Sequence, residues 1–212
     1  RVWYTEYVWA CTETTVRAAR TVRRRFSLAK TKIMLLGDSI RLGYQDKVRE
    51  FLGDGFEVYA PEDNCRFVRY AMFCLPDYLR ACPDPAVIHW NNGLWDMQHR
   101  FGDGQPFTAP LRYIEDLEKM AGLLRGVTER VIFATTTPVN PANPEQSNQT
   151  IDHFNALAVP AMRDCGLAIN DLHALVAQDV PRYICDDLTH LSEAGKEACA
   201  RQVTTSILSM LG

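Results

Sequence analysis

The sequence predicts a three-layer α/β/α domain with about five parallel strands. Short apolar segments alternate about five times with longer segments of helical periodicity. The apolar segments show no polar alternation, as expected for strands of a parallel sheet that is covered on both faces. The length of 212 residues suits one domain, and 47% hydrophobic with 23% charged residues is a globular composition. Intrinsically disordered and fibrous classes are therefore excluded.

The first half of the alternation has three expected strands and two expected helices. Residues 32–37 are an apolar run that ends at a glycine, which suits a buried strand. Residues 40–52 follow with one apolar helical face. Residues 56–59 are the second strand, 67–79 the next helix and 86–90 the third strand.

The second half continues the same order to the end of the chain. Residues 110–124 are the third expected helix, with a proline suited to its first turn, and 131–136 are the fourth strand. Residues 147–165 are helical by pattern, although Pro160 is expected to bend this helix. A short strand at 166–169 and a closing helix at 192–211 complete the domain. In such sheets the ligand site lies beyond the carboxyl ends of the strands.

Charge divides the chain into two parts. Residues 1–30 hold seven basic and two acidic residues, a net charge of +5, while 31–212 hold 16 basic and 24 acidic residues, a net charge of -8. We interpret residues 1–30 as a basic N-terminal arm that is partly ordered or an expression remnant, with an Arg-rich face for an acidic partner as the alternative. Residues 31–212 are the expected domain. The overall charge of -3 does not favour nucleic-acid binding, and no apolar run of 18 residues predicts insertion into a membrane.

The seven cysteines form no CxxC pair and match no zinc pattern, so no metal site is expected. Most of them are expected to be reduced thiols. The first residues lack the basic-then-apolar order of a signal peptide. These two observations favour a cytoplasmic location, although the chain does not begin with Met and an upstream segment stays open.

A serine follows the first expected strand in the segment Gly37-Asp38-Ser39-Ile40. At the start of a helix, free backbone N–H groups point outward, and a serine there can attack a carbonyl group while its own N–H faces the oxyanion. Helix capping by Asp38 or Ser39 is the structural alternative.

A histidine and an aspartate precede the closing helix in Asp186-Asp187-Leu188-Thr189-His190. A serine hydroxyl needs a base, and histidine is the usual one because its pKa is near neutrality. The histidine needs an acceptor on its other ring nitrogen, and a tight turn can bring Asp187 to His190. Paired with the serine at the opposite end of the chain, this spacing predicts nucleophilic catalysis.

On these two segments the sequence resembles the SGNH hydrolases of the GDSL esterase/lipase superfamily. KIMLLGDSIRLGY is similar to the first block of that family and DDLTHLSEAG to its last, and the resemblance covers about residues 31–212. It implies a flavodoxin-like SGNH hydrolase fold and ester hydrolysis through an acyl-enzyme. Ser39 would be the nucleophile, His190 the base and Asp187 the acid. No metal or organic cofactor is implied.

The middle blocks depart from the family pattern, and they concern the oxyanion hole. The family glycine of the second block is most similar to Cys65 in PEDNCRF, where a backbone N–H survives the change. The family pattern GxND reads GLWD here, which would put Trp95 at the asparagine position. A shifted alignment favours Asn91, with Asn92 as the alternative. The expected oxyanion hole is thus the N–H of Ser39, the N–H of Cys65 and the amide of Asn91.

The expected substrate is a small-molecule ester, with Asp38, Asn64 and Trp95 as substrate-binding residues. The long segment from Trp95 to Ala109 lies beside the site, and its aromatic and polar side chains either line a cleft or pack the loop onto the body. The cleft candidates beside Trp95 are His99, Arg100, Phe101 and Phe107. Such a mixture suits an acetylated sugar or another small polar ester.

Two other functions keep the same fold. An acyltransferase would use the same triad with an alcohol as acceptor, and a non-catalytic binding protein would account for the altered middle blocks. A nucleotide-binding function is not favoured, because LLGDSIRLG matches neither GxGxxG nor GxxxxGK. The sequence does not indicate an oligomeric state.

Overall fold

Five parallel strands form one sheet in the structure, a computed structural model that describes residues 29–212. The predicted N-terminal arm lies outside these residues except for its last two positions. Thr31–Gly212 form one compact unit. The strand order is β2-β1-β3-β4-β5, which is the flavodoxin-like doubly wound order. The strands are β1 (Thr31–Gly37), β2 (Phe56–Tyr59), β3 (Val87–Asn91), β4 (Val131–Ala134) and β5 (Ala168–Asn170).

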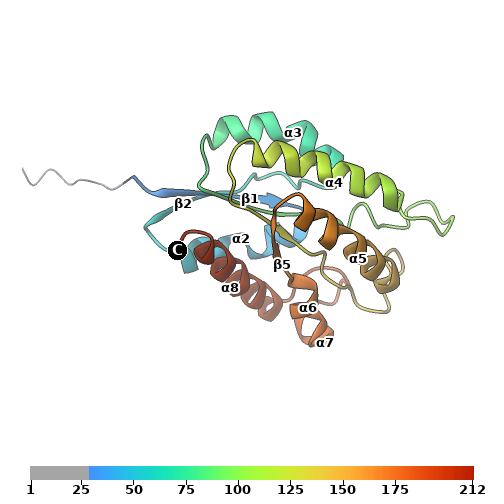
Figure 1. The fold of residues 1–212 in the computed structure, drawn as a ribbon. Helices are drawn as coiled ribbons and strands as arrows, with labels where there is room; N and C mark the ends of the chain where they lie inside the picture. The colour runs from blue at the N-terminus through green and yellow to red at the C-terminus, as the bar shows by residue number, and fades with distance from the viewer. Residues whose placement is uncertain (1–28) are drawn as a thin grey trace, which may run out of the picture. The chain divides into compact units, whose positions relative to one another are not determined.

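Helices cover both faces of this sheet, so the predicted three-layer α/β/α class is confirmed (Figure 1). α2 (Ser39–Leu52) packs against α8 (Glu193–Ser209) on one face. α3 (Val68–Ala81), α4 (Pro110–Arg125) and α5 (Asn148–Asp164) cover the other face. This split follows from right-handed crossovers, because β1 leads outward to β2 while the later strands proceed in the opposite direction.

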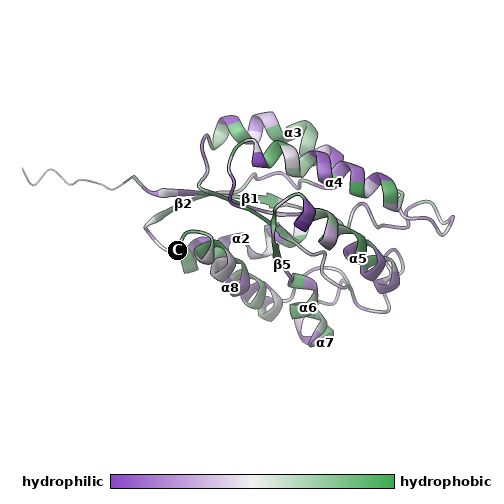
Figure 2. Ribbon diagram, viewed as in Figure 1, coloured by the Kyte–Doolittle hydropathy of each residue, from purple (hydrophilic) through white to green (hydrophobic). Residues whose placement is uncertain are grey.

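The core lies between the sheet and these helices. The strands are mainly apolar, and residues 33–36 of β1 are all buried. Figure 2 shows the hydrophobic residues on the strands and on the inner helix faces, with hydrophilic residues outside. Trp90 of β3 contacts Phe133 of β4 at a ring distance of 5.2 Å, so aromatic packing joins the two central strands.

Two short helices were not predicted, α6 (Leu172–Ala177) and α7 (Val180–Tyr183). They lie between β5 and the segment that carries Asp187 and His190. α5 continues past Pro160 to Asp164. Within residues 29–212, no helix has the length and apolar character needed to cross a bilayer.

Candidate active site

The strand-end serine and the histidine near the C-terminus meet at the carboxyl edge of the sheet. Ser39 is the first residue of α2, directly after β1. Its Oγ lies 2.9 Å from Nε2 of His190, although 151 positions separate the two residues. Nδ1 of His190 lies 2.6 Å from Oδ2 of Asp187. The three side chains therefore form one hydrogen-bonded series from hydroxyl through imidazole to carboxylate.

The turn that carries Asp187 fixes its carboxylate. Oδ1 accepts hydrogen bonds from the backbone N–H groups of Thr189 at 2.9 Å and His190 at 2.8 Å. Burial alone would raise the pKa of Asp187, but these backbone bonds and the His190 ring outweigh it and hold the pKa well below its ordinary value. The carboxylate is therefore ionised at neutral pH, and its second oxygen orients the ring of His190.

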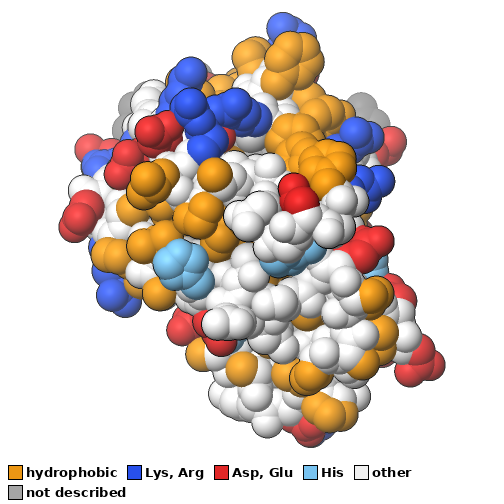
Figure 3. All heavy atoms as spheres, turned by 90° about the vertical axis from the view of Figure 1, so that its right-hand side faces the viewer, with side chains coloured by type: hydrophobic (Ala, Val, Ile, Leu, Met, Phe, Trp, Pro, Cys, Tyr) orange, Lys and Arg blue, Asp and Glu red, His pale blue; other side chains and the backbone are white. Residues whose placement is uncertain are grey.

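A cleft of about 420 Å³ opens beside Ser39 and His190. Figure 3 faces this edge of the molecule and shows histidine and an acidic side chain among backbone and other side chains in its middle, with hydrophobic side chains above them. The cleft is lined by the start of α2, by the segment before α8 and by loops between them. Its lining residues are Ser39, Asn64, Leu94, Trp95, Gln98, Arg100, Asn143, Pro144, Glu145, Gln146, Asp187, Thr189 and His190.

The structure contradicts the oxyanion role expected for Cys65. The backbone N–H of Cys65 donates to the carbonyl oxygen of Gly37 at 3.2 Å, and the residue is fully buried. This N–H is therefore already used in joining the loop after β2 to the end of β1. The preceding residue, Asn64, lines the cleft instead.

The geometry also does not support the amides of Asn91 and Asn92 as oxyanion donors. Nδ2 of Asn91 donates to Asp38 at 3.3 Å, and its Oδ1 accepts from the Tyr44 hydroxyl at 2.8 Å. Nδ2 of Asn92 donates to the carbonyl oxygen of Arg66, and its Oδ1 accepts from Trp90. Both side chains are buried and neither lines the cleft.

Asp38 was expected to bind substrate, and the structure does not support this. Its carboxylate is 1% exposed and caps α2 by accepting from the N–H of Ile40 at 3.0 Å. Burial raises the pKa of Asp38 to about 6, against the opposing effects of this bond and of the nearby Arg41 charge. The other two expected substrate-binding residues, Asn64 and Trp95, do line the cleft.

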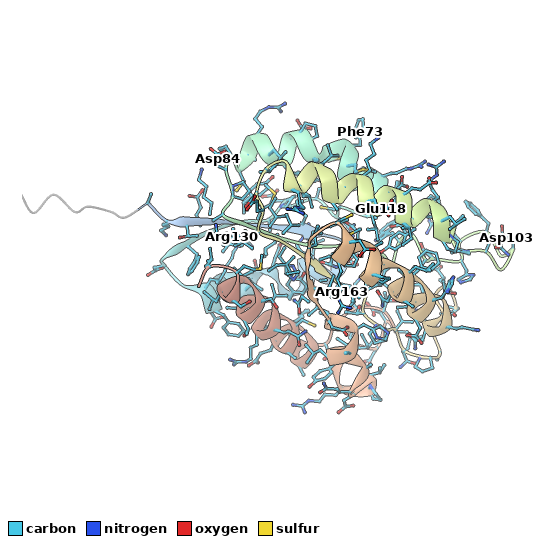
Figure 4. All side chains as sticks on the ribbon, in the orientation of Figure 1. Phe73, Asp84, Asp103, Glu118, Arg130 and Arg163 are labelled. Atoms are coloured by element: carbon cyan, nitrogen blue, oxygen red, sulfur yellow. The ribbon has the colours of Figure 1, made fainter. Side chains whose placement is uncertain are left out.

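Only part of the long loop after β3 lines the cleft. Arg100 lines the cleft, whereas His99 is turned to Thr150, with Nε2 and Oγ1 3.1 Å apart. Phe107 packs against Phe67 at a ring distance of 5.3 Å, and Phe101 is 74% exposed beside it. The tip of this loop, at Asp103, projects furthest from the body (Figure 4).

Sequence reasoning missed residues 143–146, which lie between β4 and α5. Asn143 and Gln146 line the cleft, and Nε2 of Gln146 donates to the carbonyl oxygen of Leu94 at 3.1 Å. Nδ2 of Asn143 donates to Oγ1 of Thr189 at 2.7 Å, next to His190. No motif marks these two residues, because the two contacts just named join positions 46 and 52 apart in the sequence. Residues 29–212 hold no group of His, Cys, Asp and Glu side chains suited to a metal ion.

Comparison with known proteins relates this arrangement to one class of fold. No family profile matches the chain, and no curated protein matches its sequence. Solved structures do match: a lipase/acylhydrolase from Enterococcus faecalis shares 19% identity over 84% of this chain and 95% of that one, with a TM-score of 0.70. An acetylxylan esterase from Geobacillus stearothermophilus shares 16% identity over 84% and 94%, with a TM-score of 0.69. A GDSL-like lipase from Bacteroides thetaiotaomicron shares 13% identity over 92% and 97%, with a TM-score of 0.68.

These structures show that the chain has the fold of the SGNH, or GDSL-like, hydrolases. The fold expected from the GDSIRLGY and DDLTHLSEAG segments is thus confirmed.

Proposed function

We propose that the protein is a serine esterase that hydrolyses small carboxylic esters through an acyl-enzyme. The observation that carries this proposal is the 2.9 Å contact between Ser39 and His190 at the floor of an open cleft. The contact places a hydroxyl against a base whose other nitrogen contacts an ionised carboxylate, Asp187. The names of the matching solved structures, which include lipases and acetylxylan esterases, support the same class of reaction.

The proposed reaction has two halves. In the first, Nε2 of His190 takes the hydroxyl proton as Oγ of Ser39 attacks the ester carbonyl carbon. The tetrahedral intermediate collapses, the C–O bond to the alcohol breaks, and His190 gives its proton to the leaving alkoxide. In the second, His190 takes a proton from water as its oxygen attacks the acyl-serine carbonyl carbon. Collapse then breaks the bond to Oγ of Ser39 and releases the acid, and His190 returns the proton to Oγ. Asp187 keeps the ring oriented and stabilises its positive charge in both halves.

The proposed oxyanion hole differs from the one expected from sequence. Ser39 is the first residue of α2, so its N–H has no partner within the helix. The N–H of Asn64 donates to no acceptor among residues 29–212, and Asn64 lines the cleft with Ser39. The indole N–H of Trp95 likewise has no acceptor in the described part of the chain and lines the same cleft. We assign these three donors to the oxyanion.

The lining of the cleft favours a polar alcohol part of the ester. Amide side chains of Asn64, Gln98 and Gln146 line the cleft together with Trp95. Amide groups donate to and accept from hydroxyls, and an indole ring packs on the apolar face of a sugar. Acetyl esters of carbohydrates are therefore the proposed substrates, in keeping with the acetylxylan esterases among the matching structures.

Replacement of the nucleophile tests the proposal. Ser39→Ala is expected to abolish turnover of an aryl acetate and labelling by a fluorophosphonate, with an unchanged circular dichroism spectrum. Ser209→Ala, on the exposed end of α8, is the matched control and should keep full activity. Wild-type turnover in the Ser39→Ala variant would overturn the proposal.

A further inference from the structure

Arg41 is a fully buried cation two residues after Ser39 in α2. It forms no ion pair with any carboxylate among residues 29–212. An unpaired charge is costly to bury, and a lysine or arginine that only packed in the core would be disfavoured relative to an apolar residue. The triad chemistry proposed above does not use this side chain. Its burial therefore calls for another explanation.

The guanidinium instead donates to neutral acceptors from the end of β1, from α2 itself and from the loop after β2. Nη2 donates to the carbonyl oxygens of Asp63 at 2.7 Å and Gly37 at 3.1 Å. Nη1 donates to the carbonyl oxygen of Pro61 at 2.7 Å and to the Gln45 side chain. Three backbone carbonyls thus converge on one cation. Two of them belong to the loop after β2 and the third to the end of β1.

These contacts fix the direction of the peptide between Asp63 and Asn64. The described residues contain no cis peptide bond, and in a trans peptide the C=O and N–H point in opposite directions. Because the carbonyl of Asp63 points at buried Arg41, the N–H of Asn64 points away from Arg41. The next peptide is held as well, since the N–H of Cys65 donates to Gly37. Asn64 lines the cleft beside Ser39, and its N–H has no acceptor among residues 29–212.

We propose that Arg41 is a positioning residue that aims the N–H of Asn64 at the oxyanion. The inference rests on the proposed esterase function and goes further by explaining how the loop after β2 supplies a donor without a glycine. The guanidinium suits this role because its planar fork holds several acceptors in a fixed arrangement, which a single ammonium group cannot do. Its positive charge also stays close to the site where negative charge develops.

Kinetics of three variants test this role. Arg41→Met removes every donor at similar length, and Arg41→Lys keeps the charge without the fork. Arg49→Met is the control, because Arg49 lies on the same helix and also donates to a backbone carbonyl, that of Val58 at 3.3 Å. Each variant is assayed with an aryl acetate and with a trifluoromethyl ketone, whose serine adduct carries an oxyanion.

A misplaced donor should affect the transition state and not substrate binding. We expect Arg41→Met to lower kcat about 100-fold at nearly unchanged KM, the size of losing one oxyanion donor. The inhibition constant of the ketone should rise by the same factor as kcat/KM falls. Arg41→Lys should show a smaller loss of the same kind, and Arg49→Met should show none. A folded Arg41→Met variant with kcat within threefold of wild type would overturn the inference.

A double-mutant cycle covers the case in which Arg41→Met does not fold. Asn64→Pro removes the N–H itself, so Arg41→Lys should cost several-fold in the wild-type background and almost nothing beside Asn64→Pro. Equal losses in both backgrounds would show that Arg41 does not act through Asn64. Failure of the esterase proposal is distinguishable, because the wild type would then hydrolyse no ester and Ser39 would not react with a fluorophosphonate.

Discussion

Leu188, which lies between the acid and the base of the triad, has a left-handed backbone with φ of +70°. This conformation costs a branched residue on the order of 1 kcal/mol, and it persists only where neighbouring groups hold it. Two such groups come from the loop before α5. The carbonyl oxygen of Leu188 accepts from the N–H of Asn140 at 2.9 Å and from Nδ2 of Asn143 at 3.2 Å. Asn143 therefore holds the turn that presents Asp187 and His190.

We predict that Asn143→Ala lowers both stability and kcat. The loss of its bonds should reduce the free energy of unfolding by about 1–2 kcal/mol. Addition of Leu188→Gly should recover part of the lost kcat, because glycine adopts positive φ without support. Urea unfolding and aryl acetate kinetics measure the two effects. Asn148→Ala, which removes similar bonds to the backbone of Val139, is the control and should affect stability alone. A double variant no more active than Asn143→Ala would contradict the prediction.

For single residues, the sequence predicts the placement of those that belong to a chemical motif, but not of those whose placement depends on packing. The contact between Ser39 and His190 was predictable, because residue type, order along the chain and position at a strand end all indicate it. The buried placement of the Asn91 side chain was not predictable, because it depends on the register of β1 against β3. Gly37 pairs with Asn91, and a Cβ at Gly37 would collide with the Asn91 amide. The missing side chain of Gly37 therefore makes room for this amide beneath the turn, away from the cleft.

Among the elements, α3 is capped by a residue that is distant in sequence. Its N-cap residue, Phe67, offers no side-chain acceptor. Oδ2 of Asp96, beyond β3, accepts from the N–H of Val68 at 3.1 Å instead. Oδ1 of Asp96 accepts from the Thr108 hydroxyl at 2.8 Å. One buried carboxyl thus joins α3 to the loop that carries Trp95.

The titration of Asp96 gives a prediction for pH-dependent stability. Burial raises its pKa from 3.8 to about 7 in the folded protein, against the hydrogen bonds from Thr108 and Val68. Between about pH 4 and 7 the folded state therefore holds a proton that the unfolded state has lost. The free energy of unfolding should fall as pH rises through this window, by about 1.4 kcal/mol per pH unit at most. Asp96→Asn mimics the protonated form and lacks this dependence.

Urea unfolding of the wild type and Asp96→Asn at several pH values measures this effect. The difference in the free energy of unfolding between the wild type and Asp96→Asn removes the contributions of all other titrating groups. We expect the wild type to lose stability relative to the variant from pH 4 to 7, with a constant difference above pH 8. Parallel curves across the whole range would show that Asp96 is ionised in the folded state.

The elements themselves were largely predictable, with two exceptions. The five strands and the five longer helices follow from apolar runs and helical periodicity. α6 and α7 contain six and four residues, so they are too short to show a period. Each begins after an aspartate whose side chain accepts from the backbone, Asp171 for α6 and Asp179 for α7. These caps are visible in the sequence only once a helix is already suspected.

For the whole molecule, the described unit has a core of its own. The buried apolar residues extend from Ile33 to Ile207, and the N–H of Thr31 pairs with Gly55. We therefore predict that a chain of residues 29–212 keeps its fold and the proposed esterase activity. Relative to the full chain, the free energy of unfolding should change by less than about 1 kcal/mol and Tm by less than about 4 °C in thermal unfolding. Aggregation or a larger fall in Tm would show that residues 1–28 contribute to the stability of the domain.

The two halves of the proposed site lie near opposite ends of this unit, Ser39 at its first turn and His190 just before α8. During synthesis on the ribosome, the serine emerges long before the imidazole is translated. Under the proposed function, a nascent chain hydrolyses no ester until α8 leaves the exit tunnel and docks on α2. The first appearance of ester hydrolysis would then report when folding is complete, without an added probe.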